Sequence, residues 1–352
     1  MSIAPRANPE LAGHETSEAS LRRLAEAGRL PHAILICGPS GIGKATLAFR
    51  LARFLLAPVE HRAAPDAGLA IDPESGVFRR VAAGGHADLL TVEREWDPQR
   101  RRLRGEIVAE DAREIAQFLH LTAAEGGWRI VIVDGAEEMN RSAANALLKI
   151  LEEAPRRALL LLVSHAPGRL LPTIRSRCRR FPLDPPAPEV AARLLAQQRP
   201  DLAAPERQTL AALTGGSIGG ALQLADAGGV ELYRALTELI ASAPQVDLAK
   251  LHSFADRLAR RDAENAYRAA GTLLLQLLAR VAMAGARRTL GAGEIVAGEG
   301  EAVRHLAGRA DPARWAALRE EVANNFGRTD GLNLDRKQAF LGAFFAISDL
   351  SR

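Results

Sequence analysis

Cysteine is scarce in this 352-residue chain, which has two, at positions 37 and 178. Two thiols cannot form a four-cysteine zinc site, and such sparse use is typical of proteins in a reducing cytoplasm. No apolar run approaches the roughly 18 uninterrupted residues of a membrane span, and residues 1–14 lack the apolar core of a secretory signal. The sequence therefore predicts a soluble, cytoplasmic protein with no membrane partner and no metal site.

The chain also lacks a large charge imbalance. Its formal net charge is +4, and its sequence pI is about 9.5. This balance permits contact with nucleic acid without requiring it. The basic excess is arginine, concentrated at residues 100–104 and 169–180. The first of these clusters is either part of a binding surface or simply a solvated face.

The chain does contain a phosphate-binding motif. An apolar run typical of a buried strand, residues 33–37, leads through Gly38-Pro-Ser-Gly-Ile-Gly-Lys44 into a helical pattern. The glycines at 38, 41 and 43 let backbone N–H groups converge on an anion, and Lys44 adds a point charge for the outer phosphates. We expect a nucleotide site here that also includes Thr46. The alternative is a glycine-rich turn without a ligand.

This motif departs from its template at one position. Ala45 stands where Ser or Thr would coordinate Mg²⁺. Thr46 is one residue further on and is therefore rotated about 100° around the helix. We expect a loop that holds phosphate, with ATP bound weakly or left unhydrolysed, and that handles magnesium poorly.

Two polar residues follow later apolar runs. Asp134 ends the run 128–134, a Walker B pattern that delivers an acid beside the phosphate loop. The second acid that hydrolases of this architecture use to orient water is replaced by Gly135. Ser164 follows the run 159–163, at an edge from which it can sense a γ-phosphate. The alternatives are a cap or turn role for Asp134 and a turn cap for Ser164.

Apolar runs and helical periodicity alternate along the first half of the chain, which predicts a doubly wound α/β fold. We expect strands at 33–37, 87–92, 128–134 and 159–163, and helices at 15–29, 47–56, 107–121 and 142–153. Segments 59–85, 93–105 and 287–308 lack periodicity and are expected to be irregular. Prolines after residue 181 mark a linker, and only helices are predicted beyond it, which divides the chain into domains 1–182, 183–231 and 232–352.

Three stretches together resemble the AAA+ clamp-loader family, most closely its delta-prime branch in bacterial DNA polymerase III. They are residues 38–45, Asn145-Ala-Leu-Leu-Lys-Ile-Leu-Glu-Glu153, and Leu171-Pro-Thr-Ile-Arg-Ser-Arg-Cys178. The resemblance implies an AAA+ P-loop domain with a parallel sheet and helices on both faces, followed by a small helical lid and an all-α collar. It also makes zinc unexpected, because residues 59–86 lack the cysteines that family members often use.

By the same resemblance, Arg177 is a trans-acting arginine finger. In this family the Ser-Arg-Cys segment presents an arginine to ATP bound by the neighbouring subunit, where a guanidinium can neutralise charge on the γ-phosphate. The alternative is a salt bridge within one subunit. Active family members also carry a lid arginine, and Gly219 stands at that position here.

These departures predict a clamp-loader subunit that completes a neighbour's active site without running its own. The implied partners are an ATPase subunit and a clamp-opening subunit, and through them the sliding clamp and primed DNA. Polymerase activity would belong to another chain. The alternative is an autonomous AAA+ ATPase motor acting on DNA, which should keep the groups missing at 45, 135 and 219. A small-molecule kinase explains the phosphate loop but not the Ser-Arg-Cys segment.

Overall fold

The computed structural model describes residues 3–97, 102–125, 127–287 and 293–352. The chain forms two compact units. The first consists of residues 1–199 together with 215–219, and the second of residues 200–214 together with 220–352. The three-domain division drawn from the sequence stays a prediction.

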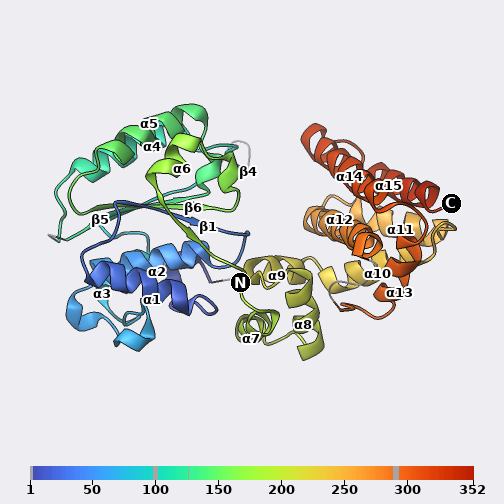
Figure 1. Cartoon of the computed structure of the whole chain (residues 1–352), viewed down its shortest axis with the longest axis horizontal. Helices are drawn as coiled ribbons and strands as arrows, with labels where there is room; N and C mark the ends of the chain where they lie inside the picture. The colour runs from blue at the N-terminus through green and yellow to red at the C-terminus, as the bar shows by residue number, and fades with distance from the viewer. Residues whose placement is uncertain (1–2, 98–101, 126, 288–292) are drawn as a thin grey trace. The chain divides into compact units, whose positions relative to one another are not determined.

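A parallel five-stranded sheet organises the first unit (Figure 1). Its strand order is β2-β5-β6-β1-β7. In register, Ala33 of β1 and Val131 of β5 both lie opposite Leu160 of β6, so the carboxyl ends of these three strands share one edge. The strands are β1 (Ala33–Cys37), β2 (Leu89–Val92), β5 (Arg129–Asp134), β6 (Ala158–Ser164) and β7 (Arg179–Pro182).

Helices cover both faces of this sheet because its central strands are apolar on both sides (Figure 1). Ile34 and Ile36 pack with the helices of one face, while Leu35 packs with those of the other. The first face carries α1 (Glu15–Glu26), α2 (Lys44–Leu56) and α3 (Gly76–Ala82), and the second carries α4 (Ala109–His120), α5 (Arg141–Glu152) and α6 (Pro172–Arg177). The predicted α/β fold is confirmed. Helix α7 (Pro188–Gln198) follows the sheet.

Two segments expected to be irregular in this unit contain regular structure. Segment 59–85 holds α3, whose first turn is capped by the Ser75 hydroxyl accepting a hydrogen bond from Phe78 N at 3.2 Å. Its brief apolar face, Val77, Phe78 and Val81, is buried, and seven residues are too few to show a clear period. Segment 93–105 contains a short antiparallel pairing of β3 (Trp96–Asp97) with β4 (Arg102–Leu103). Arg100 and Arg101 of the first arginine cluster lie outside the described residues.

The second unit is helical wherever the structure describes regular elements, which agrees with the expected collar. Tyr267, Phe326 and Phe340 stack edge to face or tilted in its core, with ring centroids 5.0 to 6.0 Å apart. The helices are α8 (Ala204–Leu213), α9 (Ile218–Asp226, beginning in the first unit), α10 (Gly229–Ala241), α11 (Leu248–Leu258), α12 (Glu264–Arg287), α13 (Glu299–Ala307), α14 (Pro312–Leu332) and α15 (Arg336–Leu350).

Two of these helices bear on the sequence predictions. Helix α13 lies inside segment 287–308, which was expected to be an irregular connection. Its inward residues Ala302, Val303 and Leu306 are buried, a pattern masked in the sequence by the surrounding glycine and alanine. Helix α12 is long and apolar enough to span a membrane, by length and composition alone. Many of its apolar residues line the core of this helical unit.

Candidate functional site

The phosphate loop connects β1 to α2 in a backbone path that only glycine follows easily. Gly41 and Gly43 have φ values of +74° and +98°, in the left-handed region. A Cβ at Gly38 would lie 2.3 Å from the carbonyl oxygen of Leu183, and one at Gly43 would lie 2.6 Å from Leu11 Cδ1. The three predicted glycines are therefore required by the geometry of the loop.

Three consecutive carbonyl groups of the loop accept hydrogen bonds from segments outside it. The Ser217 hydroxyl donates to Ser40 O at 2.8 Å, Gly219 N donates to Gly41 O at 2.9 Å, and His14 Nε2 donates to Ile42 O at 2.7 Å. The turn 215–219 and the N-terminal segment thus hold the loop from two sides. All three carbonyl groups therefore already have hydrogen-bond donors within the protein.

The donors of the loop remain available. Among the described residues, none accepts a hydrogen bond from the backbone N–H groups of residues 40–44. Lys44 is buried, and its Nζ donates to the carbonyl oxygen of Pro39 in its own loop. Burial lowers the pKa of Lys44, against the opposing charges of Asp134 and Glu137. Free N–H groups around a poorly solvated ammonium fit an anion such as a polyphosphate.

Asp134 lies at the carboxyl end of β5, as its sequence position predicts. Burial and the charge of Glu93 raise its pKa, although Lys44 acts in the opposite direction. The next residue, Gly135, has φ of +81°, and a Cβ there would lie 2.7 Å from Glu138 Oε2. Glu138 is in turn paired with Arg94 at 2.6 Å. An acidic side chain at position 135 would therefore be strained by this backbone conformation and would require the Glu138 carboxylate to move.

Ser164 adjoins the phosphate loop from β6. Its carbonyl accepts a hydrogen bond from Gly38 N at 3.3 Å, and its side chain is fully buried beside Glu137. Glu137 Oε1 accepts hydrogen bonds from the backbone N–H groups of His165 and Ala166, at 2.9 and 3.1 Å. Burial alone would raise the pKa of Glu137, but these hydrogen bonds help to lower it. Neither Glu137 Oε2 nor Ser164 Oγ is in a hydrogen bond of normal geometry.

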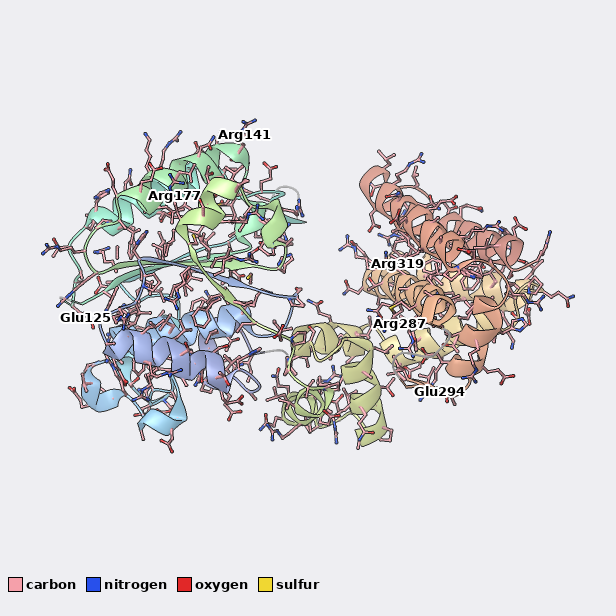
Figure 2. The ribbon with its side chains drawn as sticks, in the orientation of Figure 1. Glu125, Arg141, Arg177, Arg287, Glu294 and Arg319 are labelled. Atoms are coloured by element: carbon pink, nitrogen blue, oxygen red, sulfur yellow. The ribbon has the colours of Figure 1, made fainter. Side chains whose placement is uncertain are left out.

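Arg177 is the last residue of α6, on the surface of the first unit (Figure 2). Its Nη2 lies 2.7 Å from Glu152 Oε1, and its Nη1 donates to Thr173 O at 3.2 Å. The salt bridge weighed as an alternative from the sequence is thus present, with 37% of the Arg177 side chain exposed. An exposed ion pair of this kind is weak, so it leaves the guanidinium available to another anion.

The structure brings most of the predicted nucleotide-site residues to one edge of the sheet. Gly38, Gly41, Gly43 and Lys44 form the loop, Ser164 contacts it, and Asp134 interacts electrostatically with Lys44. Thr46 is buried in the first turn of α2. Arg177 belongs to a different element, α6, and its exposure suits a role at a surface.

A hollow of about 650 Å³ lies at the carboxyl ends of β2 and β5. Asp134 and Gly135 line it, and most of its charged residues are acidic, including Glu93, Glu114 and Glu138. Within the described ranges, no three His, Cys, Asp or Glu side chains are grouped to hold a metal ion. The acidic side chains that line this hollow create a negative potential next to Asp134, and this potential favours the protonated form of the Asp134 carboxyl group.

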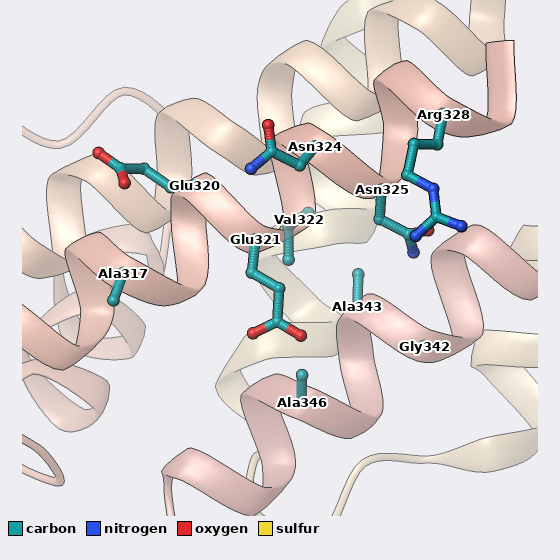
Figure 3. A pocket seen from close by; sticks show the side chains of 10 residues that line it. All are labelled: Ala317, Glu320, Glu321, Val322, Asn324, Asn325, Arg328, Gly342, Ala343 and Ala346. Atoms are coloured by element: carbon teal, nitrogen blue, oxygen red, sulfur yellow. The ribbon is translucent and has the colours of Figure 1, made fainter. Parts of the chain in front are cut away.

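Another hollow, of about 580 Å³, lies between α14 and α15 in the second unit (Figure 3). Small residues of α15, Gly342, Ala343 and Ala346, form one wall. Figure 3 shows the Glu321 carboxylate of α14 extending into this space beside Ala346. None of the residues predicted as functional lies here.

Sequence reasoning missed three residues that shape these sites. Ser217 holds the phosphate loop, Glu137 holds the backbone after Ser164, and Glu152 holds Arg177. Glu152 lies within the stretch 145–153 that carries the family resemblance, which is a signal that could have drawn attention to it. The sequence holds no comparable signal for the other two residues.

Comparison with known proteins gives a family match that lies within the first unit, and matches to relatives. Residues 13–187 match the family model described as "DNA polymerase III, delta subunit". The chain is 40% identical over 186 residues to the DNA polymerase III subunit delta' of Pseudomonas aeruginosa. This alignment covers 53% of each chain. It is 34% identical over 203 residues to the DNA polymerase III subunit delta' of Escherichia coli K12, and that alignment covers 56% of each chain.

These matches have a limited extent. The matched stretch spans about half the length of the curated relatives. A crystal structure of a DNA polymerase III gamma-subunit-related protein from Thermotoga maritima covers 94% of this chain and 99% of its own length, at 18% identity and a TM-score of 0.41. That score is too low to compare individual residues. The similarity to DNA polymerase III subunits is therefore established by the sequence matches alone.

Proposed function

We propose that the chain is a delta-prime-like clamp-loader subunit of bacterial DNA polymerase III, because residues 13–187 match that family model and two relatives at 40% and 34% identity are named subunit delta'. In this proposal it is a cytoplasmic member of a hetero-oligomer that places a sliding clamp on primed DNA. It acts beside an ATPase subunit and a clamp-opening subunit. Its relatives' names assign them to DNA polymerase III, whose polymerase activity we attribute to another chain.

The proposed contribution to catalysis is Arg177, acting as a trans arginine finger. A guanidinium that reaches the γ-phosphate of ATP on the neighbouring subunit stabilises the charge that develops in phosphoryl transfer. The observation that carries this proposal is the contrast between two cations. Lys44 is buried in the chain's own loop, whereas Arg177 is exposed at the end of α6.

We propose that the chain's own nucleotide site binds ATP weakly and does not hydrolyse it. The loop offers free N–H groups and Lys44, but Ala45 cannot coordinate Mg²⁺ and Gly135 cannot orient water. Gly219 is packed against the loop so closely that a Cβ there would lie 3.0 Å from Gly41 Cα. A side chain at position 219 would therefore require this contact to widen by a few tenths of an ångström.

The test is Arg177→Ala in a clamp loader reconstituted from its other subunits, with single-turnover ATP hydrolysis and clamp loading on primed DNA as readouts. An arginine finger contributes roughly 10³ to 10⁵ in rate at its own site. We therefore expect hydrolysis at the neighbouring site to stop and clamp loading to fall at least about tenfold.

The matched control is Arg169→Ala, which removes an exposed arginine from the same unit. The control complex should load clamps like wild type. If the Arg177→Ala complex hydrolyses ATP and loads clamps at wild-type rates, Arg177 is not the finger.

A further inference from the structure

Glu152, the last residue of α5, forms the contact that holds the Arg177 side chain. We propose that Glu152 is a positioning residue, which orients the guanidinium of Arg177 before the neighbouring nucleotide meets it. This inference rests on the proposed function, because it concerns how the finger is presented. It assigns a role to a side chain that the arginine finger itself does not explain.

Two contacts from this chain fix the guanidinium. Glu152 Oε1 accepts from Nη2 at 2.7 Å, and the Thr173 carbonyl accepts from Nη1 at 3.2 Å. A guanidinium has five N–H donors, so further donors remain for an incoming phosphate. Since these two partners lie on different elements, α5 and α6, they restrict the rotation of the side chain more than the helix alone would.

Buried residues next to Glu152 and Arg177 in the sequence fix the positions of helices α5 and α6. Leu151, beside Glu152, and Cys178, beside Arg177, are both buried in one apolar cluster. Ile174 of α6 belongs to the same cluster and has no exposed surface. The distance between the Glu152 and Arg177 backbones is therefore decided by packing, so the ion pair forms on a rigid base.

The exposure of the pair favours orientation over stability as its role. The side chains of Arg177 and Glu152 are 37% and 51% exposed. Ion pairs this exposed contribute little to folding, because water competes for both charges. An arginine otherwise samples many rotamers, and fixing it in advance reduces the entropy that is lost when it meets a phosphate. The pair is also weak enough to be exchanged for that phosphate.

The next residue provides a matched control. Glu153 has the same charge, is also exposed and caps the same helix. Among the described residues, Glu153 forms no salt bridge. Glu152→Ala and Glu153→Ala therefore change the net charge equally, and only the first removes a partner of Arg177.

The experiment compares full-length variants in the reconstituted clamp loader, by kcat and KM for ATP. We expect Glu152→Ala to lower kcat about three- to tenfold with unchanged KM and unchanged assembly, because the finger acts in the transition state. Glu152→Gln should restore most of the rate, since its amide oxygen still accepts from Nη2. Glu153→Ala should match wild type, and Glu152→Ala added to Arg177→Ala should lower the rate no further.

The outcomes separate this inference from the function on which it rests. If Arg177→Ala is inactive but Glu152→Ala matches wild type or exceeds it, the positioning role is wrong and the finger stands. An effect of Glu152→Ala that persists in the Arg177→Ala background also overturns positioning. If Arg177→Ala itself has no effect, the finger and its positioning residue both fail.

Discussion

At the scale of single residues, the nucleotide site holds two charges that the surrounding protein disfavours. Burial is the main cause of the raised pKa of Asp134 and of the lowered pKa of Lys44. Each charge partly offsets the pKa shift of the other, but both shifts remain. Such opposed shifts are typical of sites that bind charged ligands, because ligand contacts supply the solvation that the folded protein lacks.

The raised pKa of Asp134 predicts a pH-dependent effect of Asp134→Asn. The folded-state pKa of this carboxyl group lies above its unfolded value of 3.8. The free energy of unfolding therefore falls as pH rises from 3.8 to the folded-state pKa, and the full loss is present above the folded-state pKa. Asparagine mimics the neutral form, so the variant should be more stable than wild type at pH 8. The difference should shrink as pH falls toward 3.8.

Urea unfolding at several pH values measures this difference. Asp184→Asn, at an exposed position of the same unit, serves as the control and should show no stabilisation. If the Asp134→Asn variant is less stable than wild type at pH 8, the raised pKa of Asp134 is contradicted.

Lys44→Met tests whether the loop holds phosphate. A hydrogen bond to a charged group contributes about 1.5–3 kcal/mol, so polyphosphate affinity should fall roughly 10- to 100-fold. Thermal unfolding with increasing pyrophosphate or ATP measures this, since a ligand that binds the folded state raises Tm. We expect the Tm of Lys44→Met to rise only at roughly 10- to 100-fold higher ligand concentration than the wild-type Tm. An equal rise in both would exclude Lys44 from the site.

At the scale of elements, the N-terminal segment is attached to α2 by buried arginines. Arg53 is 1% exposed, donates to Arg6 O at 2.8 Å and to Asn8 O at 2.6 Å, and stacks on Phe78 with 4.5 Å to the ring centroid. Burial, with a smaller contribution from Arg50, lowers the pKa of Arg53 to about 10. The segment continues to His14, so this attachment also supports the phosphate loop.

Arg53→Met should therefore destabilise the chain by about 2 kcal/mol. The variant loses two charge-assisted hydrogen bonds to backbone carbonyls, and this loss is partly offset because no charge remains buried. Urea unfolding gives the free energy, and limited proteolysis should show earlier cleavage within residues 3–12. Arg156→Met, at an exposed site, should change neither. Unchanged proteolysis of Arg53→Met would show that the segment is held by other contacts.

At the scale of the whole molecule, the described functional features are unevenly distributed. The first unit carries the phosphate loop, Asp134 and Arg177, and the family model matches residues 13–187 within it. The second unit is helical and contains the hollow between α14 and α15.

The purified chain by itself should hydrolyse ATP negligibly. The Mg²⁺ ligand, the water-orienting acid and the lid arginine that we expect of a hydrolysing member are absent, at Ala45, Gly135 and Gly219, and losses within one active site leave little activity. Steady-state ATPase assays should give a kcat far below 1 s⁻¹, the lower end of ordinary enzymes. The reconstituted complex in the same buffer is the positive control. A kcat of about 1 s⁻¹ or more for the isolated chain would support an autonomous motor.

The sequence by itself determined the features that depend on neighbours along the chain. The strand, glycine loop and helix around Lys44 and the acid at the end of β5 were predictable, because their patterns are local. Short elements were not. Helix α3 has seven residues and the β3–β4 pairing has four in total, which is too short for a period to be seen.

Only the tertiary structure decided which groups surround these features. Ser217 reaches Ser40 across 177 residues, Glu137 reaches His165 across 28, and Glu152 reaches Arg177 across 25. No local period encodes such contacts, because they depend on strand order and on how helices pack against the sheet. The free donors of the phosphate loop and the orientation of Arg177 are therefore properties of the packed chain.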